Sequence, residues 1–483
     1  MLRVLHVLDH SLPLHSGYTF RTRAILKAQQ AAGIEVRAIT GLRRPFVWVL
    51  AYLYVDVLMP QKISYFLLAS LPVSLIVFVL AFGGWLAMDD KTGSRFSWRQ
   101  GVILTLLLYC GATTLTADFP VEAAEKWAWV WKALVFALFL PLALRTRLRI
   151  EAAVLFMVLA AGTIVINGGI KTLASGGGGY GELRTLVADN AGLYEGSTLS
   201  TVAVAIIPLV AWLARHGTVF PPSRLVTLFA VALGFACCLI PIGTQTRTGL
   251  ICLVLLALLS LRSVERRLLY LGLMGAAALA AIPFLPDSYT ARMSTIENHS
   301  ADQSASTRVA VWKWTLGYVR DHPLGGGFDS YRGNRVTIVL RDVSTSGNQT
   351  SVSERVAQDQ ARAFHSAYFE MLGEQGWPGL GLWLVLQLSG LVQLELVRRK
   401  LRGRLDPRDL SDRALAQALQ SGHCVYLFGA LFIGIAFQPF VFMLIALQIA
   451  LTGQVQRRLA GGDAASALRP ARAALQLPAG AGA

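Results

Sequence analysis

The chain has 483 residues, of which 54% are hydrophobic, and its mean hydropathy is +0.52. Soluble domains contain about 45–50% apolar residues, so this composition favours a membrane protein. The net charge of +16 raises the question of nucleic-acid binding. However, the Lys and Arg residues form short clusters between apolar runs, and no recognised nucleic-acid-binding motif accompanies them. We therefore expect a polytopic membrane protein with no nucleic-acid partner.

The five cysteines lie in or beside apolar runs, and none forms a C-x-x-C pair: Cys110, Cys237, Cys238, Cys252 and Cys424. A disulfide framework or a zinc site is not expected from such an arrangement. No pattern of acidic residues indicates another metal site, and we expect no cofactor. The start of the chain is too polar for a cleavable signal peptide.

Residues 1–43 differ from the rest of the chain. Residues 2–8 and 34–40 are predicted to be short strands, and residues 19–32 a helix between them. This unit resembles the first unit of family 4 glycosyltransferases, including the His15-Ser-Gly17-Tyr loop, but the rest of that fold is absent. About forty residues cannot bury a stable core alone. We therefore expect a fusion remnant or a docking piece rather than a working site.

Apolar runs dominate the chain from residue 44 to residue 456. A helix needs about 20 apolar residues to cross a bilayer. By this measure we predict an all-α polytopic membrane protein with about twelve spans, at 45–60, 64–87, 101–118, 128–144, 150–170, 198–214, 225–243, 249–261, 268–286, 378–397, 422–437 and 440–455. The eighth span is short, and the last two are divided at Pro439.

Basic residues mark alternate loops between these runs, and the positive-inside rule makes those loops cytoplasmic. Both termini are then cytoplasmic, including an Ala-, Gly- and Pro-rich tail at 457–483 that we expect to be disordered. The opposite loops, the largest at 287–377, face the periplasm if the protein lies in a bacterial inner membrane. No internal repeat is visible, which argues against an inverted-repeat transporter.

Arg247 is the most informative residue of the short outer loops. It lies in Gly243-Thr-Gln-Thr-Arg247-Thr-Gly, a tight connection between two apolar runs. An Arg at the mouth of two spans is costly unless it has a partner, and its planar guanidinium matches phosphate oxygens. A snorkelling anchor or a structural ion pair is the alternative. Its place on the outer side, against the positive-inside trend, favours function.

The long loop contains two predicted helices. Arg308, Trp312 and Leu316 share one face of the first by their spacing, and the glycines at 325–327 allow a close backbone approach. His322 precedes a proline and is predicted to be a turn residue.

His365 opens the second helix. A lone His is usually structural, but a His with a pKa near neutral can accept a proton from a hydroxyl, and nearby arginines can stabilise a departing diphosphate. Glu370 and Glu374 follow on the same helix, where we expect a solvated face.

Three motifs together resemble the signature blocks of the O-antigen ligase and polymerase superfamily. They are Gly243-Thr-Gln-Thr-Arg247-Thr-Gly, Ser306-Thr-Arg308 with Trp312 and His322-Pro-Leu-Gly-Gly-Gly, and Phe364-His365-Ser-Ala-Tyr-Phe-Glu-Met-Leu-Gly-Glu-Gln-Gly376. Arg43-Arg-Pro-Phe-Val47, residues 122–127 and Asp189-Asn190 are similar to the subgroup described as exosortase-associated O-glycosylation ligases. The resemblance covers about residues 43–455.

The resemblance implies a helical membrane fold that transfers glycan, without a metal, from a polyprenyl-diphosphate carrier to an acceptor hydroxyl. His365 would activate the acceptor, and Arg247 and Arg308 would hold the diphosphate. Residues predicted to contact substrate are Lys126, Arg184, Asp189, Trp312 and Tyr368. Two positions depart from the family pattern: Thr246 replaces the usual Ser, and Ala191 replaces the second Asn of an Asp-Asn-Asn block.

Two other functions fit the same sequence. A polymerase on the same fold would use another lipid-linked glycan as acceptor, as in exopolysaccharide synthesis. A non-catalytic lipid-glycan transporter would carry charges along a central path within the spans, whereas here the charges crowd the outer mouths. The sequence leaves open the sugar and the acceptor, which could be lipid A core, a protein Ser or Thr, or another glycan.

Overall fold

The computed structural model describes residues 3–8, 35–40, 45–64, 70–89, 94–174, 192–262, 303–346 and 349–474, with single positions and short stretches of up to four residues between these ranges. The described chain is mostly helical and carries two separate two-stranded sheets. It divides into two compact units, residues 1–92 and 93–483. All three predicted catalytic residues belong to the second unit.

The first unit begins with the two predicted strands, β1 (Arg3–Leu8) and β2 (Glu35–Thr40). They pair in parallel along their whole length, which confirms the strand predictions. The helix predicted between them lies mainly outside the described residues. Three helices follow in this unit: α2 (Pro45–Leu58), α3 (Pro60–Ile63) and α4 (Val73–Met88).

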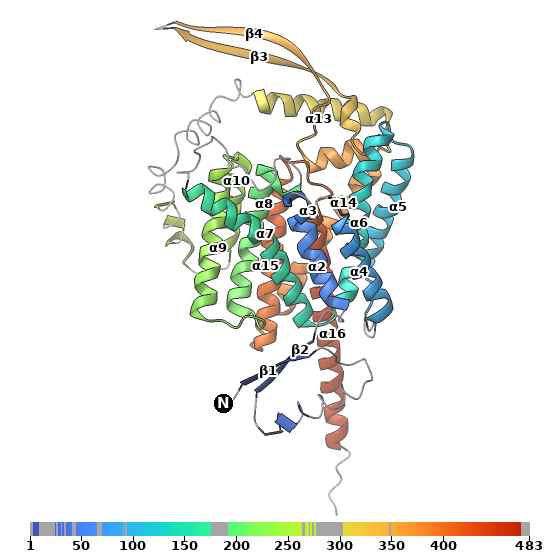
Figure 1. The fold of residues 1–483 in the computed structure, drawn as a ribbon, viewed down its shortest axis with the longest axis vertical. Coiled ribbons are helices and arrows are strands. Elements are labelled where there is room, and N and C mark those ends of the chain that lie inside the picture. The colour runs from blue at the N-terminus through green and yellow to red at the C-terminus, as the bar shows by residue number, and fades with distance from the viewer. Residues whose placement is uncertain are drawn as a thin grey trace, which may run out of the picture. The chain divides into compact units, whose positions relative to one another are not determined.

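The second unit is a bundle of helices with one hairpin (Figure 1). Its elements are α5 (Trp98–Leu115), α6 (Pro120–Ala143), α7 (Arg147–Ala174), η1 (Gly192–Tyr194), α8 (Gly196–His216), α9 (Arg224–Gly243), α10 (Arg247–Leu261), α13 (Gln303–Asp321), η3 (Ser330–Gly333), β3 (Arg335–Ser346), β4 (Gln349–Gln360), α14 (Ala367–Lys400), α15 (Pro407–Gly429) and α16 (Pro439–Ala474). Helix α8 packs against α7, α9 and α15, and α16 packs against α6 and α14.

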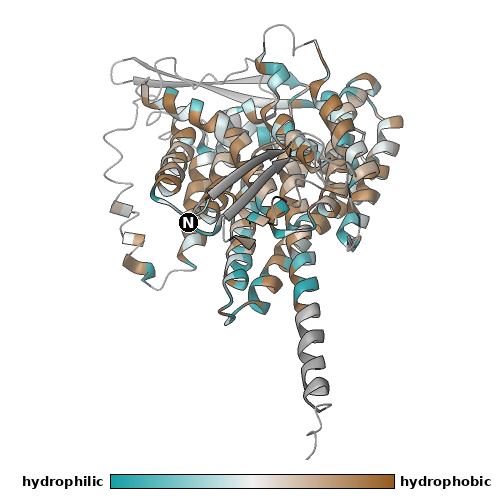
Figure 2. Cartoon of the chain, turned by 60° about the horizontal axis from the view of Figure 1, so that its bottom comes forward, coloured by the Kyte–Doolittle hydropathy of each residue, from teal (hydrophilic) through white to brown (hydrophobic). Residues whose placement is uncertain are grey.

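Six of the described helices are long and apolar enough to cross a membrane: α6, α7, α8, α9, α14 and α16. Helices α2, α4 and α10 are apolar but shorter. The chain is therefore a multi-pass helical membrane protein, but the predicted count of twelve spans is not confirmed. The ninth predicted span, 268–286, lies largely outside the described residues. Figure 2 shows the apolar residues spread along the bundle helices.

The six helices differ in how deeply they lie in the bundle. The apolar window of α16 is 83% buried, whereas that of α9 is only 22% buried. Helix α16 is therefore central, and α9 presents a broad apolar surface at the edge. In a membrane protein such a surface faces lipid.

The predicted eleventh span at 422–437 is wrong. Helix α15 runs from Pro407 to Gly429, and residues 430–438 are not helical. The early turns of α15 are polar, so a hydropathy window misses them, yet Asp409 and Asp412 are buried against Arg458 of α16. Helix α16 extends to Ala474 and so covers part of the tail for which disorder was predicted.

Two elements occupy the long polar segment ahead of α14. Helix α13 confirms the predicted helix around Arg308 and lies at one end of the bundle (Figure 1). The antiparallel hairpin of β3 and β4 follows, with Arg335 opposite Gln360. The sequence analysis missed this hairpin. Its signal is the Gly347-Asn348 pair between runs rich in Val, Ile, Thr and Ser.

Helix α14 is interrupted at Gly376, whose backbone has φ 62° and ψ −165°. The glycine run at 325–327 packs against this kink: Gly326 N donates to Gly373 O at 3.0 Å, and Gly327 N donates to Glu374 O at 2.9 Å. A Cβ at Gly325 would lie 2.5 Å from Glu374 O. The close approach expected of these glycines is confirmed, and it fixes the direction of the first turns of α14.

Candidate active site

His365 lies in the short segment between β4 and α14, and three neighbouring contacts hold this segment. The buried side chain of Asn334 donates through Nδ2 to Arg362 O (2.6 Å) and accepts at Oδ1 from Arg362 N (3.0 Å). The Trp312 indole donates to Phe364 O (2.9 Å). His365 itself has φ 47°, a left-handed backbone that is uncommon for a non-glycine residue.

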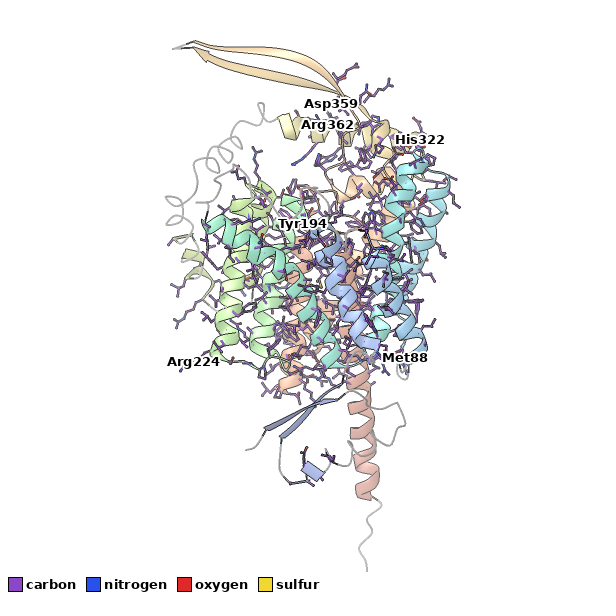
Figure 3. The ribbon with its side chains drawn as sticks, viewed as in Figure 1. Met88, Tyr194, Arg224, His322, Asp359 and Arg362 are labelled. Atoms are coloured by element: carbon purple, nitrogen blue, oxygen red, sulfur yellow. The ribbon has the colours of Figure 1, made fainter. Side chains whose placement is uncertain are left out.

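The residues on either side of His365 are buried, whereas His365 is exposed. Phe364 packs into a small cluster with Val311 and Val336, and Ser366 is 1% exposed. Figure 3 shows this end of the second unit, where Arg362 and Asp359 lie near α13 and form an ion pair. The segment therefore presents one imidazole outward from a fixed backbone.

The charges around His365 favour its neutral form. Partial burial lowers the pKa of His365 below its ordinary value of 6.5, and the positive charges of Arg308 and Arg362 lower it further, while Glu195 opposes them. The imidazole ring is partly desolvated by the surrounding protein but remains accessible to solvent on one side. At neutral pH the imidazole can therefore accept a proton.

Arg247 is the first residue of α10, directly after the tight connection from α9. Thr244 and Thr246 of this connection bond to Ser200 of α8 at 2.7 and 2.8 Å. Gln245 between them has φ 51°. This network of hydroxyl groups fixes the start of α10, and with it the backbone that carries Arg247.

Glu195 lies near two parts of the candidate site: the tight connection from α9 to α10 that carries Arg247, and the segment that carries His365. Its carboxylate caps α8 by accepting from Ser197 N (3.0 Å) and Thr198 N (2.6 Å). A Cβ at the next residue, Gly196, would lie 3.3 Å from the Cβ of Thr244. The charge of Glu195 also acts on His365, so the start of α8 lies near both the Arg247 connection and the His365 segment.

Lys126, predicted to contact substrate, lies in an interior ion cluster, and its substrate role stays a prediction. Its Nζ is 2.7 Å from both Glu370 Oε1 and Glu374 Oε1 and 3.8 Å from Asp329 Oδ1. The expectation that Glu370 and Glu374 form a solvated face is wrong, since their side chains are only 8% and 0% exposed. Helical spacing places the two carboxylates on one face, but only the packing of α6 determines that this face is buried.

The remaining predicted substrate residues divide into two groups. Trp312 is half-buried and stacks on Phe369 at a centroid distance of 4.9 Å. The Tyr368 hydroxyl donates to Leu427 O at 3.1 Å. Arg184 and Asp189 lie outside the described residues. The structure therefore shows Trp312 supporting the His365 segment, and the roles of the other residues stay predictions.

Sequence reasoning missed Asn334 and Glu195 as neighbours of this site. Asn334 directly precedes the unpredicted strand β3, and its buried amide gave no signal without that strand. Glu195 directly precedes helix α8, and an acidic residue at a helix N-terminus is the signal that could have indicated it. His322 is exposed and stacks on Tyr318 at 4.4 Å, which fits the predicted turn at this position.

Comparison with protein families identifies the part of the chain that carries these residues. Residues 230–384 match the family described as O-antigen ligase. This stretch is an O-antigen ligase domain. It contains Arg247, Arg308 and His365, the kink at Gly376 and the hairpin, so the three predicted catalytic residues all fall in the matched region.

The part of the chain before the O-antigen ligase domain has a separate match. Residues 32–218 match DUF5935, a family of unknown function. No curated protein matched the chain. Neither family match supports the resemblance of residues 1–43 to family 4 glycosyltransferases, so that resemblance stays a prediction.

Proposed function

We propose that this protein is an inner-membrane glycan ligase, and that it works at the periplasmic face without a metal. Its donor is a glycan on a polyprenyl diphosphate, and its acceptor is a hydroxyl group. The O-antigen ligase domain and the membrane helices support a membrane enzyme that transfers glycan. The donor, the acceptor, the face and the orientation with both termini in the cytoplasm belong to the proposal.

In the proposed reaction His365 takes the proton from the acceptor hydroxyl. The oxygen attacks the anomeric carbon as the bond to the diphosphate oxygen breaks, and the electron pair of that bond leaves with polyprenyl diphosphate. Arg308 and Arg247 stabilise the negative charge on the leaving group. A single displacement inverts the anomeric configuration, so a product with retained configuration would contradict this step.

One observation carries the proposal: an exposed imidazole with a lowered pKa is held on an anchored segment beside Arg308. A base must be neutral before it accepts a proton, and cations nearby are suited to a diphosphate. The ion cluster of Lys126 offers no such opening, because its carboxylates are buried and face the ammonium.

The test uses purified protein, a polyprenyl-diphosphate glycan and candidate acceptors, with EDTA controls. We expect glycan on one acceptor and released polyprenyl diphosphate, both unaffected by EDTA. His365→Ala should lower the transfer rate by about 10²–10⁴-fold, the range for loss of a general base. Arg308→Ala should also lower it strongly.

The matched control is His322→Ala, which removes an exposed histidine that, within the described part of the chain, stacks on Tyr318 and bonds at Nδ1 to Tyr318 O. It should leave transfer nearly unchanged. A ladder of products would favour the polymerase. Normal delivery of glycan by His365→Ala would contradict the proposed chemistry and favour the transporter.

A further inference from the structure

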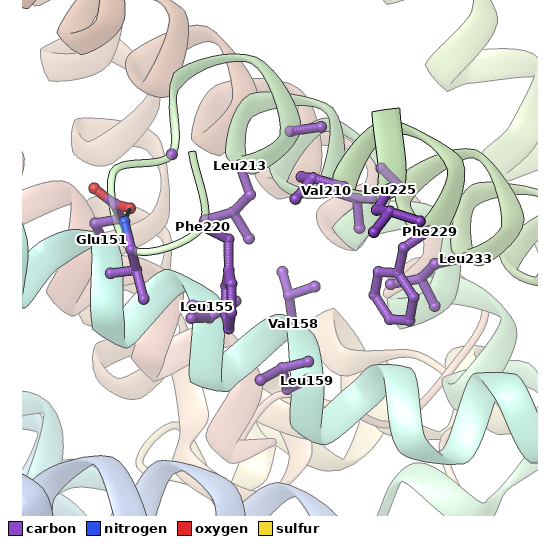
Figure 4. A pocket seen from close by; sticks show the side chains of 15 residues that line it. Glu151, Leu155, Val158, Leu159, Val210, Leu213, Phe220, Leu225, Phe229 and Leu233 are labelled. Carbon is purple, nitrogen blue, oxygen red and sulfur yellow. Dashed lines mark hydrogen bonds between the residues drawn. The ribbon is translucent and has the colours of Figure 1, made fainter. Parts of the chain in front are cut away.

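An apolar groove lies in the second unit between α7, α8 and α9 (Figure 4). Its cavity has a volume of about 360 Å³. Val158, Val210 and Leu233 form its buried wall, while Leu225 and Phe229 at its edge are 79% and 50% exposed. A groove that is apolar inside and open at its edge suits a hydrocarbon chain.

Glu151 is the one charged residue of the lining, and its carboxylate is already occupied. It accepts hydrogen bonds from the backbone N of Thr218 and Val219 and from the Thr218 hydroxyl. These bonds fix the loop between α8 and α9 that closes one end of the groove. The carboxylate therefore builds the groove and is satisfied without a ligand.

Basic side chains lie at this closed end. Arg215 and His216 end α8, and Arg224 opens α9, next to the lining residue Leu225. Arg215 and Arg224 are exposed, and neither forms a hydrogen bond or an ion pair with another residue in the described ranges. The end of the groove is therefore locally cationic.

We propose that this groove binds one anionic phospholipid, with an acyl chain between α7 and α9 and its phosphate at Arg215 and Arg224. The apolar wall matches the chain, and the exposed guanidinium groups match phosphate oxygens. Helix α9 is only 22% buried within the protein, so a lipid reaches the groove from the side. Basic clusters at a membrane surface attract anionic lipids.

The geometry separates this lipid from the donor of the transfer reaction. Arg224 begins α9, and Arg247 follows the other end of the same helix of 20 residues. A helix of that length spans about 30 Å, so a diphosphate held at Arg247 cannot also contact Arg224. Figure 3 places Arg224 at the end of the second unit opposite His322 and Arg362.

The test is native mass spectrometry of the delipidated full-length protein in detergent. Phosphatidylglycerol and phosphatidylcholine with identical acyl chains are titrated separately and in competition. We expect the first lipid adduct to favour phosphatidylglycerol by about tenfold, the ratio expected for one charge-assisted hydrogen bond. The double variant Arg215→Gln/Arg224→Gln should lose this preference.

Two control pairs make the result specific. Lys313→Gln/Arg320→Gln removes two exposed charges from α13 and should keep the preference. Ala230→Phe fills the groove and should displace the first adduct of both lipids. Ala232→Phe changes an exposed position of the same helix that does not line the groove, and this variant should keep the first lipid adduct.

Equal binding of the two lipids by the wild type would overturn the proposal. So would an unchanged adduct in Ala230→Phe. A long-chain polyprenyl phosphate that displaces phosphatidylglycerol from the wild type would assign the groove to the carrier lipid instead and would also overturn it. The readout is lipid binding, so its outcome is independent of whether the protein transfers glycan.

Discussion

Two groups of titratable residues lie at the start of α14, and they differ in exposure to solvent: one group is buried and the other is exposed. Lys126 faces Glu370 and Glu374 inside the bundle, and its side chain is 13% exposed. His365 lies just before the same helix, is exposed, and has positive charges beside it. Only nine positions along the chain separate His365 from Glu374.

The comparison shows how burial determines the role of a charge. A charged group taken out of water must be paired, and Lys126 and its two carboxylates satisfy one another. Such a cluster holds elements together: Glu370 Oε2 also accepts from Ala436 N at 3.0 Å, and Glu374 Oε1 accepts from Asp329 N at 3.0 Å. His365 keeps an open side and is available to a substrate.

The largest expected effect is on the buried cluster. Lys126→Met removes the positive partner and leaves two buried carboxylates uncompensated, which should lower the free energy of unfolding by about 3–5 kcal/mol. Thermal unfolding in detergent checks this prediction. The control is Lys132→Met on the same helix, since Lys132 forms no hydrogen bond or ion pair within the described part of the chain. Equal stability of the two variants would show that the cluster does not stabilise the fold.

The next effect concerns the contact that fixes the first turns of α14. Gly325→Ala places a side chain on a residue with φ 83° and within 2.5 Å of Glu374 O. The strained backbone alone should cost about 1–3 kcal/mol of stability, and transfer activity should fall as the His365 segment moves. Thermal unfolding and transfer rates are measured together.

Gly317→Ala is the matched control for that variant. Gly317 lies in α13, and an added Cβ would have no heavy atom within 4 Å. This change should be neutral or slightly stabilising, because Ala favours a helix over Gly. Loss of activity in both variants would contradict the assignment to the Gly325 contact.

A smaller effect is expected at the anchor of the His365 segment. Trp312→Phe keeps an aromatic ring that can stack on Phe369 but removes the hydrogen bond to Phe364 O. The loss should cost about 1 kcal/mol, and transfer should weaken chiefly in kcat. Trp314→Phe, which has no such bond to the segment, is the comparison, and kinetics identical to those of Trp312→Phe would argue against the anchoring role.

The smallest effect is a change in pH dependence, since Arg308 and Glu195 are only half-buried and solvent partly screens their charges. His365 acts when neutral, so activity should fall as the pH drops through its lowered pKa. Arg308→Gln removes a charge that lowers this pKa, so the acidic limb of the rate profile should move to higher pH. Glu195→Gln removes the opposing charge, so the limb should move to lower pH. Profiles of kcat/KM that move in the same direction would refute this account.

The class of the protein and its three predicted catalytic residues follow from the amino-acid sequence alone. Long apolar runs specify membrane helices locally, because each helix satisfies its own backbone hydrogen bonds. The order and spacing of the motifs indicate the O-antigen ligase family without any coordinates. The family match at 230–384 contains Arg247, Arg308 and His365.

The number of helices and their first and last residues were harder to predict from the sequence. Hydropathy averages one segment at a time, so it missed the polar first turns of α15 and placed that span about fifteen residues late at its start (407 against 422). The charges of those turns are buried because Arg458 lies opposite them. That pairing depends on another helix and leaves no signal within the segment.

The division between structural charges and open charges depends on the tertiary structure. Lys126 and Glu374 are 248 residues apart in sequence, yet their side chains form one ion pair. Asn334 and Trp312 lie elsewhere in the chain, and they bond to the backbone of Arg362 and Phe364 beside His365. A sequence pattern describes the face of one helix, whereas burial and pairing depend on the neighbours that the fold brings to that face.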